Sequence, residues 1–218
     1  MLRVIDCQLL DRLSAAARAS ARGRVNHNFH LPEEPIQRML QAFEPETYLA
    51  PHKHERPEKL DLFLCLRGRA ALLVFDDGGA VAEAHVLQPG GPMHGAEVPP
   101  GVWHSLVSLE PGSVLYEVLD GPYVPGTGIT FAPWAPAEGS HEAPAYRERL
   151  RRMALERQAE GPQEARLVLA VDAAALDEVS RRAAASPRRR ANRNYHRLEE
   201  PIQRMLNAVE PETYVPPH

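Results

Sequence analysis

The sequence places histidines at spacings that suit metal binding. His52 and His54 stand two residues apart at the end of ETYLAPHKH, and His104 ends the segment PPGVWH. Residues i and i+2 of a strand project to the same face, so His52 and His54 can reach one ion. Imidazoles with a carboxylate suit a divalent transition metal such as Zn, Fe, Mn or Ni better than Ca or Mg. We therefore predict one such metal, bound by His52, His54 and His104.

The carboxylate of this site has two candidates. Asp61 lies in the apolar segment KLDLFLCLRG, which has the composition of a strand, whereas Glu58 follows Pro57 in a segment typical of a loop. We predict Asp61 as the fourth metal ligand, because a strand holds a side chain in a defined direction. Glu58 is the alternative.

The elements that must position these residues are short strands. Glycine and proline pairs separate apolar segments at roughly ten-residue spacing, which is typical of an all-β sandwich or barrel. Asp77-Gly78 marks a hairpin. The predicted strands are 46–52, 60–67, 70–76, 80–87, 94–98, 102–109 and 113–118.

Helices are expected on both sides of the strands. Residues 6–19 have apolar side chains at helical spacing behind Asp6, a plausible N-cap, and residues 33–43 begin with two glutamates and an early proline. Residues 144–159 form a third, charged helix. The first domain, 1–160, thus comprises a helical arm (1–44), a barrel (45–120) and a cover segment with its helix (121–160).

The chain also contains an internal repeat. Residues 24–52 and 190–218 are identical at 20 of 29 positions with a constant offset of 166. Residues 161–218 are therefore a truncated repeat that matches 1–52. One explanation is a longer tandem protein that has been cut short. The other is a working structural element, which we expect to adopt the arm conformation and dock on a barrel edge, in a homodimer with swapped tails.

Several motifs resemble those of one known family. The two histidines, the following carboxylate and PxGxxH at 99–104 resemble both halves of the cupin double motif. The ordered segments RxNxNxH, IQR, LRGR, the FDDGG hairpin and EVLDGPY, within about residues 20–140, resemble the WbuC family of bacterial cupin-fold metalloproteins. The resemblance implies a cupin double-stranded β-helix, a jelly-roll barrel, with a bound metal. It also implies a link to surface-polysaccharide biosynthesis. The departure is Asp61, where that family has glutamate.

Other polar residues are candidates for binding a small-molecule, carbohydrate ligand. Arg24, Asn26, Asn28 and His30 alternate, so they line one face of an extended segment. That face can bind an anionic substrate, or it can satisfy backbone groups where the arm crosses the sheet. Tyr123 is a further candidate for the ligand site.

Three functions fit a metal in this setting. The first is isomerisation or epimerisation of a sugar or nucleotide-sugar, with the metal as Lewis acid and Glu117 as the catalytic acid or base. Glu117 can instead be a buried carboxylate paired with arginine. The second function is iron-dependent dioxygenation, and the third is metal-dependent sugar binding or regulation without catalysis.

Composition argues against two other classes of partner. The net charge is −4, and the arginine-rich tail is nearly neutral, so we expect no nucleic-acid partner. No apolar run approaches the ~18 residues of a membrane-spanning helix, and polar residues interrupt any signal-peptide core at the N-terminus. We expect a cytoplasmic protein that does not bind membranes.

Overall fold

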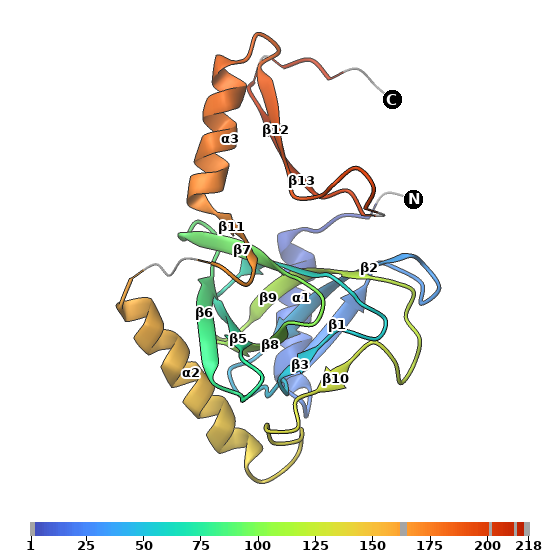
Figure 1. Ribbon diagram of the computed structural model, residues 1–218, viewed down its shortest axis with the longest axis vertical. Coiled ribbons are helices and arrows are strands. Elements are labelled where there is room, and N and C mark those ends of the chain that lie inside the picture. Colours follow the sequence, from blue (N-terminus) through green and yellow to red (C-terminus); the bar gives the residue numbers. More distant parts are fainter. Residues whose placement is uncertain (1–2, 162–164, 201, 212, 216–218) are drawn as a thin grey trace. The chain divides into compact units, whose positions relative to one another are not determined.

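The computed structural model describes residues 3–161, 165–200, 202–211 and 213–215. The chain divides into two compact units, residues 1–170 and 171–218 (Figure 1). Each unit is described by itself below.

The first unit begins with the predicted N-terminal helix. Helix α1 covers Cys7–Ala19, and the carboxylate of Asp6 accepts a hydrogen bond from the backbone N–H of Leu9 at 2.8 Å. This contact satisfies one of the N–H groups that a helix start leaves without a partner. The apolar side of α1 packs on two strands, β1 (Arg24–Asn28) and β2 (Ile36–Phe43).

The predicted helix over residues 33–43 is wrong. Residues Ile36–Phe43 form strand β2, which pairs with β1 on one side and with β9 (Ser113–Asp120) on the other. The segment contains good helix formers, but local propensity is a weak preference that packing overrides. Between two strands, both edges of the segment form backbone hydrogen bonds and its apolar side chains are buried on both faces.

The remaining strands of the barrel lie close to their predicted positions. They are β3 (His52–Lys53), β4 (Asp61–Arg67), β5 (Ala70–Phe75), β6 (Val81–Leu87), β7 (Met93–Val98) and β8 (Trp103–Ser108). The predicted strand 46–52 is wrong in extent, because residues 44–51 run as turns and irregular chain before β3. At the predicted hairpin, the Asp76 carboxylate accepts hydrogen bonds from the backbone N–H groups of Gly78 and Ala80.

The strand order identifies a jelly roll. Among strands β1 to β10, one sheet contains β1-β2-β9-β4-β7 in that order, and the other has the order β10-β3-β8-β5-β6, where β10 is the short strand Thr130–Phe131. Strands β2 to β9 therefore divide between two antiparallel sheets in the interleaved order of a double-stranded β-helix. The prediction of an all-β jelly-roll barrel with flanking helices is confirmed.

The core lies between the two sheets and continues under the second long helix. Strand β5 is buried along its whole length. Leu72 and Val74 face the barrel interior, whereas Leu73 and Phe75 face helix α2 (Ala143–Ala159), as the two-residue period of a strand requires. Helix α2 lies along the outside of β5 and β6 (Figure 1) and buries Leu150 completely. This confirms the predicted helix at 144–159.

The second unit repeats the arm of the first. Strand β11 (Leu169–Asp172) spans the boundary between the units, and helix α3 covers Ala173–Ala185. Strands β12 (Arg190–Asn194) and β13 (Met205–Val209) then form a two-stranded sheet. Each of α3 and β12 lies 166 residues after its counterpart, α1 or β1. Among the described residues, β13 pairs with β12 alone, whereas β2 has two neighbours.

The missing neighbour changes the exposure of matching side chains. Met205 and Val209 are 41% and 60% exposed, whereas their counterparts Met39 and Phe43 are 8% and 1% exposed. The tail therefore has the conformation of the arm, but β13 lacks the second neighbouring strand that β2 has. Within the described part of the chain, no helix is long and apolar enough to cross a membrane.

Candidate metal centre

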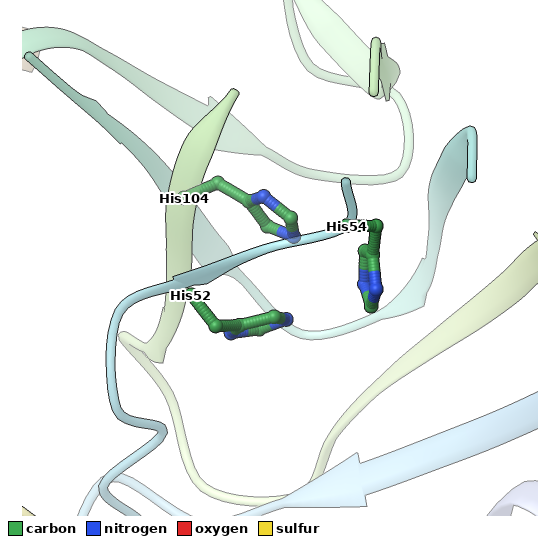
Figure 2. A group of neighbouring side chains, drawn as sticks. All are labelled: His52, His54 and His104. Carbon is green, nitrogen blue, oxygen red and sulfur yellow. The ribbon is translucent and has the colours of Figure 1, made fainter. Parts of the chain in front are cut away.

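The pairing of two strands brings the histidines together. His52 in β3 lies directly opposite His104 in β8, and His54 follows two residues later on the same side. One side-chain nitrogen of each of these residues lies within 4.8 Å of those of the other two. Figure 2 shows the three rings gathered around a common space. The predicted histidine triad is thus assembled by a strand pair and by the two-residue period of an extended chain.

Asp61 reaches the same point from the opposite sheet. It begins β4, is 2% exposed, and its Oδ2 atom lies 3.5 Å from Nε2 of His54 and 3.7 Å from Nε2 of His104. Glu58, the alternative carboxylate, is exposed and lies in a turn where it forms an isolated β-bridge with Glu55. The structure therefore brings Asp61, and not Glu58, to the histidines.

The outer nitrogen of each ring is held by the backbone. Nδ1 of His52 lies 3.0 Å from the carbonyl oxygen of Ala50, and Nδ1 of His104 lies 3.0 Å from that of Val102. Nδ1 of His54 contacts the carbonyl of Gly128. A carbonyl oxygen only accepts, so Nδ1 carries the proton in each ring and Nε2 keeps its lone pair in the neutral form.

These residues fit a transition-metal ion. Among the described residues, Nε2 of His104 and Oδ1 of Asp61 are buried and have no hydrogen-bond partner, which is costly unless another ligand satisfies them. Metal-binding histidines typically donate their other ring N–H to a carbonyl or carboxylate, as all three do here. Three imidazoles and one carboxylate are a donor set for Zn, Fe, Mn or Ni.

The electrostatics of the cluster favour His52 as a neutral ring and Asp61 as an anion. Burial, together with the neighbouring rings of His104 and His54, lowers the pKa of His52 to about 3. Burial by itself raises the pKa of Asp61, but the two histidines beside it outweigh this effect and lower the pKa. Burial also opposes the charge on His54, yet the Asp61 carboxylate gives that ring a raised pKa.

A second carboxyl group faces Asp61 from β9. Glu117 is 5% exposed and accepts a hydrogen bond from the side-chain amide of Gln41 in β2. Burial, and then the negative charge of Asp61, raise the pKa of Glu117 well above its ordinary value. Among the described residues, Glu117 interacts with Gln41 and Asp61 and is not paired with an arginine.

A cavity of about 570 Å³ opens onto these groups. Its walls include His52, His54 and Glu117, together with three of the residues predicted to bind a ligand: Arg24, Asn26 and Tyr123. This volume lies in the range of small-molecule sites. The cavity can therefore admit a ligand to the histidine cluster.

Two predicted ligand residues lie outside this cavity. Asn28 is exposed near the end of β1 and does not line it. Nδ1 of His30 accepts a hydrogen bond from the backbone N–H of Arg38 at 2.9 Å, so its ring supports the β1–β2 hairpin. Arg24 has a mixed role: it lines the cavity, donates to the carbonyl of Tyr48 at 2.9 Å and contacts the Glu138 carboxylate at 2.6 Å.

Sequence reasoning missed three parts of the site. Gln41 lies in the segment predicted as a helix, and Gly128 lies in the cover segment, whose path the sequence does not reveal. Lys59 lines the cavity beside Gly128 and is 6% exposed. A compositional signal is present, because Lys53 and Lys59 are the only lysines among 25 basic residues and both lie among the proposed ligands, between His52 and Asp61.

Comparison with protein families gives a match to both arms. The model of a domain of unknown function, DUF6016, matches residues 5–87 and 171–218. The two matched segments begin 166 residues apart, the offset of the internal repeat. Among curated proteins, none matches the sequence.

Solved structures with similar folds share little sequence with this chain. KdgF from Halomonas sp. is 19% identical, with a TM-score of 0.36 over 44% of this chain and 79% of that chain. Oxalate decarboxylase from Bacillus subtilis is 18% identical, with a TM-score of 0.37 over 50% of this chain and only 27% of that chain. A Klebsiella pneumoniae protein with a double-stranded beta-helix domain is 17% identical, with a TM-score of 0.43 over 61% and 98% of the two chains.

Proposed function

This chain belongs to the DUF6016 family, a domain of unknown function, and we propose that it is a metal-dependent cupin enzyme acting on a sugar or nucleotide-sugar. The proposed reaction is an isomerisation or epimerisation. The metal ligands are His52, His54, His104 and Asp61. The observation that carries the proposal is the triad of imidazoles. Their Nδ1 atoms are held by carbonyls, one nitrogen of each ring lies within 4.8 Å of those of the other two, and the buried Asp61 carboxylate lies beside His54 and His104.

The sugar class rests on the sequence and on two polar residues in the cavity wall. The ordered motifs that resemble the WbuC family associate the chain with surface-polysaccharide biosynthesis. Arg24 and Asn26 line the cavity, and side chains of these types donate hydrogen bonds to hydroxyl and anionic oxygens.

A bound divalent metal supplies Lewis acidity that polarises a carbonyl oxygen. The protein supplies the rest of the chemistry. The backbone carbonyls of Ala50, Val102 and Gly128 fix the orientation of the imidazole rings. Glu117 lines the cavity and interacts with the proposed ligand Asp61, so we assign it the proton transfer at the substrate carbon.

Metal content tests the proposal directly. The full chain is purified without a metal-affinity tag, and metals per chain are measured by mass spectrometry beside a His52→Ala/His104→Ala double variant. About one equivalent in the wild type and none in the variant is the expected result. A wild type that holds no metal and takes up none from added Zn, Fe, Mn or Ni overturns the proposal.

Oxygen dependence separates the reaction classes, because the same donor set also suits redox-active iron. Candidate sugars and nucleotide-sugars are incubated with metal-loaded protein with and without oxygen. Isomerisation is expected to proceed anaerobically with zinc or manganese. Turnover that requires both iron and oxygen supports a dioxygenase instead. Saturable sugar binding with no turnover supports a metal-dependent binding module.

A further inference from the structure

The cavity wall contains a buried lysine with little compensation for its charge. Lys59 is 6% exposed, and its ammonium group donates to the carbonyl of Pro122 at 2.9 Å. In the described part of the chain, this is the one hydrogen bond of the ammonium group, and no carboxylate lies within ion-pair distance. An ammonium group has three N–H donors, so two remain for a ligand. A buried cation without a counter-charge is costly.

The position of Lys59 ties it to the metal site. The side chain packs against Gly128, where an added Cβ would lie 3.2 Å from Cε of Lys59. The carbonyl of Gly128 in turn holds the ring of His54. Lys59 and the proposed metal ligand His54 therefore both contact Gly128 and line the same cavity.

The other charges of the cavity do not neutralise Lys59. The lining includes two carboxyl groups besides the three cations. Glu138 is engaged by Arg24 at 2.6 Å and by Arg22 at 3.4 Å, and Glu117 is engaged by Gln41. The negative charge of Asp120 does act on Lys59, but this carboxylate accepts a hydrogen bond from the backbone N–H of Leu60 and is not part of the lining.

We infer that the cavity binds an anionic small molecule and that Lys59 is the residue that selects it, with its ammonium group contacting a carboxylate or phosphate oxygen of the ligand. Lysine suits this task as a compact point charge. The inference specifies the substrate of the proposed function. It rests on that function in one respect, namely that the ligand binds in the cavity of the metal site. It narrows the substrate class from sugars in general to sugars that carry a negative charge.

Binding of three probes tests the inference on the full chain. Affinities for D-glucuronate, D-glucose 6-phosphate and D-glucose are measured by calorimetry, with metal content determined on the same samples. At least one charged sugar is expected to bind at least tenfold more tightly than glucose, and the two charged probes distinguish a carboxylate from a phosphate. Equal affinities for all three, or binding of neither charged sugar to metal-loaded protein, overturn the inference.

Matched variants then assign the selectivity to one residue. Lys59→Met, which keeps the length of the side chain without its charge, is expected to abolish the preference for charged sugars while metal content stays unchanged. Lys59→Arg is expected to retain the preference. Lys53→Met is the control, because Lys53 contacts Glu55 at 2.8 Å and the ring of Trp103 and does not line the cavity.

The outcomes separate this inference from the proposed function. A preference that survives in Lys59→Met overturns the role of Lys59 even if the metal is present. A wild type without metal overturns the proposed function, whereas charge-dependent binding that requires Lys59 still supports the inference about the ligand.

Discussion

The imidazole of His54 donates its Nδ1–H to the backbone carbonyl of Gly128, a residue 74 positions further along the chain. The contact joins a proposed metal ligand to the cover segment that follows the barrel. The cover segment is thus part of the metal site, because it fixes the tautomer and the direction of one ligand.

Substitution of Gly128 is expected to weaken metal binding. Gly128 has a φ of +81°, and a Cβ there would crowd Lys59, so Gly128→Ala displaces the carbonyl that holds His54. Loss of such a contact typically lowers metal affinity about 10- to 100-fold. Competition with a chelator measures the affinity.

Gly126→Ala is the matched control for this prediction. Gly126 lies in the same segment with a φ of +76°, but a Cβ there meets nothing within 4 Å. The Gly126→Ala substitution therefore introduces similar backbone strain without crowding Lys59. Equal losses of affinity in the two variants contradict the prediction.

The two candidate carboxylates can be distinguished by conservative substitution. Asp61→Asn removes the buried charge that faces His54 and His104, and we expect it to reduce the metal retained after dialysis by at least tenfold. Glu58→Gln alters an exposed side chain and is expected to retain the wild-type metal content. Metal loss in the Glu58 variant alone would assign the ligand to Glu58.

The two cysteines are expected to differ in their effect on alkaline stability. Cys65 is buried, and burial raises the pKa of its thiol to about 12, whereas Cys7 is exposed. An unfolded thiol has a pKa of about 8.5, so above that pH the unfolded chain loses the proton first. Cys65 therefore makes the free energy of unfolding fall as pH rises from about 8.5 toward about 12, by at most about 1.4 kcal/mol per pH unit.

Urea unfolding as a function of pH measures this effect. Cys65→Ala is expected to flatten the alkaline decline in the free energy of unfolding, and Cys7→Ala is expected to leave it unchanged. Identical slopes in the two variants would refute the assignment to Cys65.

The tail is predicted to support a homodimer. Among the described residues, β13 pairs with β12 alone, so its other edge is open to pairing, and the strand contains neither proline nor a charged residue that would block it. Light scattering is expected to give a dimer for the full chain and a monomer for a chain lacking residues 171–218. Val209→Lys, which adds a charge to the exposed strand, is expected to weaken the dimer. An unchanged mass and melting temperature after the deletion would exclude this role, including the swapped tail.

The barrel is largely predictable from the sequence, because its apolar segments are short and end at glycine or proline turns. Strands β4 to β9 agree closely with the apolar segments of the sequence. Ile36–Phe43 was not predictable by the same reasoning, because its residue types favour a helix and its strand conformation depends on pairing with β9, more than seventy residues later. Local sequence does not encode that neighbour.

The site likewise contains residues that the sequence identifies and residues that only tertiary packing brings in. His52, His54 and His104 were found because two are local in sequence and the third belongs to a recognisable motif. Gln41, Lys59 and Gly128 come from segments whose direction is set by tertiary packing. Asn28 and His30 continue the alternating polar pattern of Arg24 and Asn26, but neither lines the cavity. The ring of His30 instead accepts a hydrogen bond from the backbone of the β1–β2 hairpin.

The repeated arm allows the stability of the same hairpin to be compared at two places in one chain. The hairpins β1–β2 and β12–β13 have nearly the same sequence and the same register, yet one is built into a barrel and the other is not. Amide hydrogen exchange at paired positions, such as Leu40 and Leu206, therefore reports the same local structure in two environments. The difference in protection gives the free energy by which the barrel stabilises the β1–β2 hairpin against opening. Both values come from a single molecule under identical solvent conditions.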